Sequence, residues 1–116
     1  MIGGMTRDQY ERQARRLIAE GERLQAQPTL VGLRGWIAAS DELLRTAWGS
    51  MDRYHLSWLL VGRPAHAVRG RAMSPTEESA YVREVAAAKT AVLSLSLRAV
   101  AIDGMPFVGE SSAPGS

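Results

Sequence analysis

The sequence of 116 residues predicts one all-α domain, in which a first helix packs on a long antiparallel helical hairpin. Two observations predict this fold. Apolar residues recur at intervals of three and four in three separate segments, which is the spacing of one side of a helix. Residues that favour helix starts precede two of these segments, and proline or glycine follows the periodic stretches. We therefore expect three predicted helices joined by short breaks.

The first helix is expected to run from about residue 7 to residue 26. Thr6 is a good N-cap, and Gln9 stands three positions later, where it can complete a capping box. The helix has a narrow apolar side among mostly charged residues, formed by Tyr10, Ala14, Leu17, Gly21 and Leu24. Pro28 ends it, because the residue before a proline is disfavoured in the α region.

The second segment, residues 30–61, keeps the three-four alternation for more than four heptads. Three glycines within it each weaken a helix by up to about 1 kcal/mol relative to alanine. We therefore expect either one long helix or a helix with a single break. The two candidate positions for that break are residues 40–41 and residues 48–49.

The third helix has the clearest boundaries. Ser74 is its N-cap, Pro75 occupies the first turn, and Glu77 can complete a capping box. Gly104 ends it as a left-handed residue. Its apolar residues form two stripes, a surface too wide for one neighbouring helix to cover. We therefore expect the chain to complete a four- or six-helix bundle by self-association, as a homo-oligomer.

An alternative exists for residues 92–108. The stretch from Leu93 to Leu97 alternates apolar and serine residues, which is the period of a strand. Asp103-Gly104 could then form the turn of a β-hairpin. The helix is favoured, because the Ser-Pro-Thr-Glu start at residue 74 has no role without one.

The folded domain is expected to span residues 6–104. The composition indicates a cytoplasmic protein. Residues 1–5 and the tail of residues 105–116, rich in Gly, Ser, Ala and Pro, are expected to be flexible. The chain has no cysteine, which suits a reducing compartment. No signal peptide is visible, and no apolar run approaches the ~20 residues of a membrane span, so no membrane contact is expected.

Positive charge accumulates in the connection between the second and third helices. Residues 63–73 contain three arginines, one histidine and no acidic residue, although the net charge of the chain is only +2. This arginine-rich loop could bind phosphate or another anion through Arg63, His66, Arg69 and Arg71. The simpler interpretation is a solvated polar loop. The loop supports a second function, that of an accessory nucleic-acid-binding subunit of a larger complex.

The tryptophans are the main candidates for a protein interface. Trp36 and Trp58 lie nearly on one side of the predicted helix, whereas Trp48 points roughly 120° away. They could all be core residues. A monomer of this size would struggle to cover three faces, however, so we expect Trp36, Trp48 and Trp58, with Tyr81, to contact a protein partner.

Metal and catalytic chemistry find little support. Asp52 and His55 are three residues apart, but a metal needs further ligands, so a helical ion pair or a packed histidine is expected. Adjacent acids such as Asp41-Glu42 diverge by about 100°, and no nucleophile or phosphate-loop motif occurs. The sequence thus predicts a non-enzymatic assembly subunit, without metal or cofactor, that binds protein through apolar helix faces. A helical metal or nucleotide enzyme is the third alternative.

Overall fold

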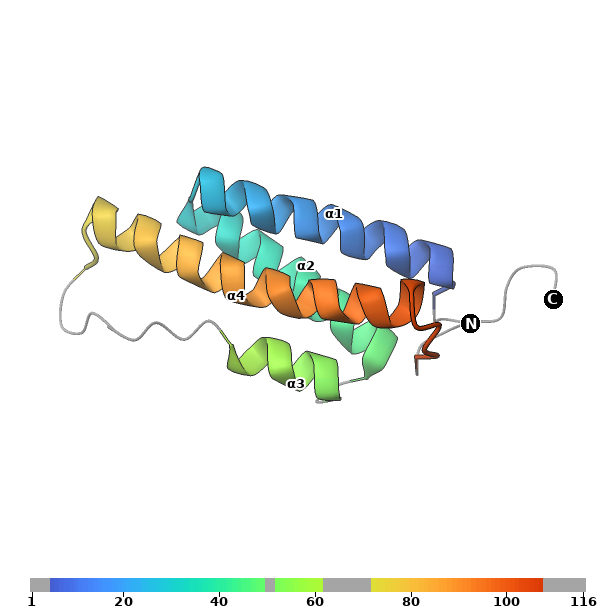
Figure 1. Ribbon diagram of the computed structural model, residues 1–116. Helices are drawn as coiled ribbons and strands as arrows, with labels where there is room; N and C mark the ends of the chain where they lie inside the picture. Colours follow the sequence, from blue (N-terminus) through green and yellow to red (C-terminus); the bar gives the residue numbers. More distant parts are fainter. Residues whose placement is uncertain (1–4, 50–51, 62–71, 108–116) are drawn as a thin grey trace.

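The computed structural model describes residues 5–49, 52–61 and 72–107. These residues form four helices and no strand: α1 (Arg7–Ala26), α2 (Leu30–Trp48), α3 (Arg53–Leu60) and α4 (Pro75–Ala101). Figure 1 shows α4 between α1 and α3, with α2 behind it. α1 makes its most extensive contacts with α4. The predicted all-α fold, with the first helix packed on the long last helix, is therefore confirmed.

The second predicted helix is broken at one of the two expected positions. α2 ends at Trp48, and Gly49 has a φ of 96°, a conformation that side chains with a Cβ rarely adopt. Asp52 then caps α3 by accepting a hydrogen bond from the Tyr54 amide at 3.4 Å. The chain reverses here, so α3, and not α2, runs antiparallel to α4 (Figure 1).

Both predicted capping boxes are present. The Thr6 hydroxyl accepts from the Gln9 amide at 3.2 Å, and the Gln9 side chain accepts from the Thr6 amide at 2.9 Å. Ser74 and Glu77 make the same reciprocal pair at 3.2 Å and 2.8 Å. These bonds satisfy amides that the first helical turn leaves without backbone partners.

The β-hairpin alternative for residues 92–108 is wrong over its described part, because α4 continues to Ala101. Gly104 has a φ of 66°, and the Met105 amide donates to the Ala99 carbonyl at 2.9 Å, a bond typical of a Schellman helix end. The chain then turns back on the bundle and buries Phe107. Packing on three sides of α4 thus outweighs the strand-like alternation of its serines.

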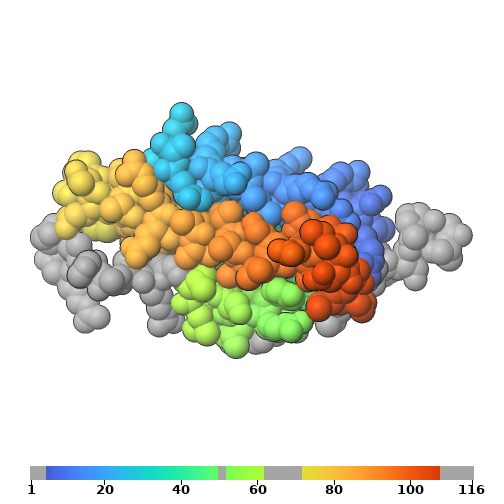
Figure 2. Space-filling view, in the orientation of Figure 1, coloured from blue at the N-terminus to red at the C-terminus, as the bar shows by residue number. Residues whose placement is uncertain are grey.

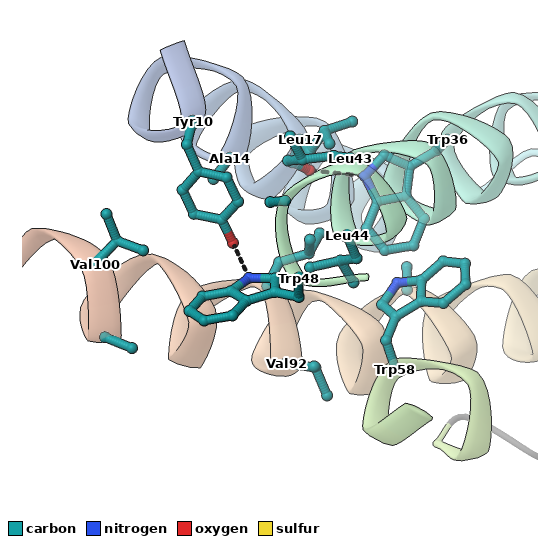
Figure 3. Packing of buried hydrophobic residues seen from close by; sticks show 14 of the residues in the cluster. Tyr10, Ala14, Leu17, Trp36, Leu43, Leu44, Trp48, Trp58, Val92 and Val100 are labelled. Carbon is teal, nitrogen blue, oxygen red and sulfur yellow. Dashed lines mark hydrogen bonds between the residues drawn. The ribbon is translucent and has the colours of Figure 1, made fainter. Parts of the chain in front are cut away.

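The hydrophobic core extends along the whole bundle. It includes Met5 before α1 and Phe107 after α4, so the packed residues extend beyond the predicted limits of residues 6–104. Figure 3 shows Tyr10, Trp36 and Trp48 pointing between the helices, with Trp58 reaching in from α3. At the α1–α4 contact Gly21 is buried against Thr90 and Trp36. Three helices therefore approach closely at this glycine.

Candidate protein interface

The predicted anion-binding residues Arg63, His66, Arg69 and Arg71 lie outside the residues that the structure describes. Their proposed contact with phosphate therefore stays a prediction.

The three tryptophans belong to the core of a single chain. Trp36, Trp48 and Trp58 are 3%, 4% and 2% exposed. The expectation that one chain cannot cover three indoles is wrong, because the break at Gly49 divides them between two helices that pack on α4 from different sides. Their surfaces are not available to a partner in this fold. Tyr81 is partly buried against the same core, and its interface role stays a prediction.

A buried hydrogen-bond chain joins α2, α1 and α4. The Trp48 indole donates to the Tyr10 hydroxyl at 3.1 Å, and that hydroxyl lies 2.5 Å from Ser96 Oγ (Figure 3 shows the first bond). Ser96 in turn donates to the Leu93 carbonyl at 2.8 Å, so the Tyr10 hydroxyl must donate to Ser96. Burial raises the pKa of Tyr10, while the bonds to Ser96 and Trp48 lower it. The neutral phenol is therefore a structural link between three helices.

A second polar cluster holds α3 against α2. His55 is 3% exposed, and its Nε2 lies 2.6 Å from Asp41 Oδ1. The other Asp41 oxygen forms an ion pair with Arg45 Nε, at 3.2 Å within α2. The prediction of a packed histidine is confirmed. Its carboxylate partner comes from a different helix, a contact that spacing along one helix cannot reveal.

The single lysine of the chain holds α3 against α4. Lys89 is buried, its Nζ donates to the Trp58 carbonyl at 2.5 Å, and it lies 4.1 Å from the centre of the Trp58 ring. The Trp58 carbonyl is one of the last four of α3, which lack partners within the helix. A cation at this end also interacts favourably with the helix dipole. This role of Lys89 was not predicted from the sequence, although a single lysine within an apolar helix is a signal for it.

The described residues contain a groove, but no group of metal-binding side chains and no membrane-spanning helix. No group of three His, Asp or Glu side chains among them could hold a metal ion. None of the described helices is long and apolar enough to cross a membrane. A groove of about 800 Å³ between α1 and α2 is lined by Arg12 and Arg16 together with Glu20 and Glu42. Its lining therefore carries both positive and negative charge.

Large apolar side chains are exposed on α3 and α4. On α3, Leu56, Leu59 and Leu60 are 36%, 37% and 55% exposed, so one side of this eight-residue helix is apolar and accessible. At α4, Leu95 is 59% exposed and Ile102, just past the last helical residue, is 71% exposed. Figure 2 shows the outer side of α4 as a continuous band between α1 and α3. Clustered exposed apolar side chains, such as those on α3, are typical of a protein interface.

Comparison of the chain with protein families, with curated proteins and with solved structures finds no match in any of the three. The functional assignment therefore depends on the residues of this chain alone.

Proposed function

We propose that the protein is a non-enzymatic helical assembly subunit that binds protein through the apolar sides of α3 and α4. One observation carries this proposal: four large apolar side chains are exposed on these two helices and a fifth immediately follows α4, and none of the five belongs to the buried core. They are Leu56, Leu59, Leu60, Leu95 and Ile102. Scattered exposed leucines are common on monomers, but three of the eight residues of one helix are not scattered.

The way α3 is held supports this function. Two buried side chains of α3 position the helix, since Trp58 packs in the core and His55 pairs with Asp41. From α4, Lys89 binds the backbone at the end of α3. The leucines of the opposite side are thus presented by an ordered helix. A rigid apolar surface binds more tightly than a mobile one, because less conformational entropy is lost on association.

Burial of these side chains supplies the free energy for binding. Removing apolar surface from water is worth roughly 25 cal/mol per Å², or about 1.5–3 kcal/mol for a fully exposed leucine. The side chains on α3 and α4 are between one-third and three-quarters exposed, so each retains part of this value. Hot spots of this kind commonly dominate the affinity of an interface.

Site-specific photo-crosslinking in cells that carry the natural gene tests the proposal. A benzoylphenylalanine replaces Leu60 in one variant and Leu95 in another, and Glu22 on the exposed side of α1 serves as the control. We expect discrete protein adducts from at least one apolar position and none from Glu22. Absence of adducts at both leucines, with normal amounts of folded protein, would overturn the proposal.

A further inference from the structure

The outer side of α4 has a symmetric pattern of residues. Six positions on it, and Ile102 directly after the helix, are exposed and follow one another at intervals of 4, 3, 4, 4, 3 and 4: Ala80, Glu84, Ala87, Ala91, Leu95, Arg98 and Ile102. This spacing keeps all seven on one side of the helix. Because all seven side chains are exposed, no other described segment buries this side. The spacing reads the same in both directions from Ala91.

The side chains complement each other about the same centre. A two-fold rotation about an axis at Ala91, perpendicular to the helix, generates a second copy of this face. It places Glu84 of one copy opposite Arg98 of the other, so opposite charges meet. The same rotation places Leu95 opposite Ala87 and Ile102 opposite Ala80. Each large exposed side chain thus meets the smallest one with a Cβ, and a large residue packs well where its partner is small.

We propose, within the assembly function above, that the partner of α4 is a second copy of this chain. The two α4 helices pack antiparallel about a two-fold axis at Ala91. Such an interface is isologous, so every contact occurs twice, including the pair between Glu84 of one copy and Arg98 of the other. A parallel pair in register would instead place Glu84 against Glu84 and Arg98 against Arg98, which is repulsive.

The length of the face sets the expected strength of the dimer. From Ala80 to Ile102 it spans about 33 Å at 1.5 Å per residue. This is one helix pair, which lies at the small end of specific interfaces. We therefore expect a reversible dimer that forms over the micromolar range. Light scattering or sedimentation from about 5 to 500 µM spans such dissociation constants.

Single cysteines give the most direct test, because the chain has none of its own. Ala91→Cys places the thiols of the two copies at the two-fold axis, so mild oxidation should give a disulfide-linked dimer. Ala87→Cys is the matched control, because its two copies would lie about 12 Å apart along the helix, beyond disulfide reach. A mixture of Ala87→Cys and Leu95→Cys proteins should link to each other, since these positions are opposite.

Charge reversal tests the register independently. Glu84→Arg and Arg98→Glu should each raise the dissociation constant by about tenfold, because each creates two repulsive contacts in the dimer. The double variant should return it to within about threefold of wild type. Glu22→Arg on α1 carries the same charge change at an exposed position off this face, and should leave the dissociation constant unchanged.

The outcomes separate this inference from the proposed function. Failure of Ala91→Cys to link, together with crosslinking adducts at Leu60, would overturn the α4 pairing and leave protein binding through α3. A chain that is monomeric at about 500 µM would also overturn the pairing. If that monomer gives adducts at Leu95 with a different protein, the assembly function stands with another partner. If neither leucine gives adducts, both proposals fail.

Discussion

The two helices that flank α4 are attached to it by different means. α1 is held along its length by close packing, with Gly21 at the point where α1, α2 and α4 meet. α3 has only eight residues and is held by Trp58 together with two polar anchors, His55 on Asp41 and Lys89 on a backbone carbonyl. Added volume in a closely packed contact costs about 1–3 kcal/mol and displaces its neighbours, whereas removal of a polar anchor adds no volume and loses a hydrogen bond. Substitutions in the two regions should therefore differ in how much they change the unfolding free energy and in how far the change extends through the protein.

The largest effect is expected at Gly21. In Gly21→Ala the new Cβ would overlap Thr90 Oγ1 and lie 2.8 Å from Trp36 Cζ2. Overpacking of this kind costs about 1–3 kcal/mol, and here it outweighs the roughly 1 kcal/mol that alanine gains over glycine in a helix. We expect a net loss of about 1–2 kcal/mol in the free energy of unfolding, measured by denaturant titration.

Gly35→Ala is the matched control, because a Cβ at this position of α2 meets nothing within 4 Å. It should stabilise the protein by about 0.5–1 kcal/mol. Thr90 Oγ1 has no hydrogen-bond partner among the described residues, so Thr90→Ala removes one overlapping atom without breaking a bond there. The Gly21→Ala and Thr90→Ala pair should lose less stability than Gly21→Ala alone. Equal stability of Gly21→Ala and wild type would show that the contact is not close.

The next largest effect is expected at Tyr10. Tyr10→Phe removes the acceptor of Trp48 and the donor to Ser96, and both of these groups are buried. A buried polar group without a partner costs about 1–3 kcal/mol. Thermal unfolding should show this loss at neutral pH.

Tyr10 should also make the unfolding free energy of the protein fall at alkaline pH. Burial raises the pKa of Tyr10 above its ordinary value of 10.0, so the unfolded chain releases this proton first as the pH rises. The associated stability is complete below pH 10 and is lost as the pH rises towards the pKa of the folded state. The unfolding free energy of wild type should therefore fall above about pH 10 more steeply than that of Tyr10→Phe. Identical slopes would exclude Tyr10 as the source.

The sequence predicted the contacts within single helices better than the arrangement of the helices. Contacts near in sequence were predictable, because Thr6 with Gln9 and Ser74 with Glu77 are short-range chemistry in a fixed spacing. The end of α4 was predictable from Gly104 for the same reason. The direction of the chain after residue 49 was not, since a periodic pattern continues unchanged across a reversal. That reversal decides where the tryptophans lie.

Buried polar contacts escaped prediction for a related reason. His55 with Asp41 and Lys89 with Trp58 join different helices, so their distances depend on how the helices pack. Phe107 was assigned to a tail because a glycine and a proline precede it, yet it packs against Tyr10 and Trp48. The exposed residues of α3 could have been found as a run of leucines, but only packing shows that they stay accessible.

A smaller and local effect is expected at the α3 anchor. Lys89→Met keeps the apolar stem and removes the Nζ bond to the Trp58 carbonyl and the cation above the ring. The loss should be about 1–2 kcal/mol, the value of a hydrogen bond to a charged group less the gain from burying methionine. Hydrogen exchange should accelerate in α3 and remain unchanged in the middle of α1. Uniform acceleration in both helices would contradict a local attachment of α3.

The smallest effect is expected on the outer side of α3, and it separates stability from binding. Leu60→Gln changes a side chain that is 55% exposed and directed away from the core, so the unfolding free energy should shift by no more than about 0.5 kcal/mol. Leu44→Ala, at a position 0% exposed, is the contrasting variant and should cost about 2–5 kcal/mol. Both are measured in dilute protein by denaturant unfolding, where association does not contribute. A large loss in Leu60→Gln under these conditions would mean that the leucine supports the monomer. An unchanged monomer would support binding as the reason for an apolar side chain there, because the packing of the described residues would not require it.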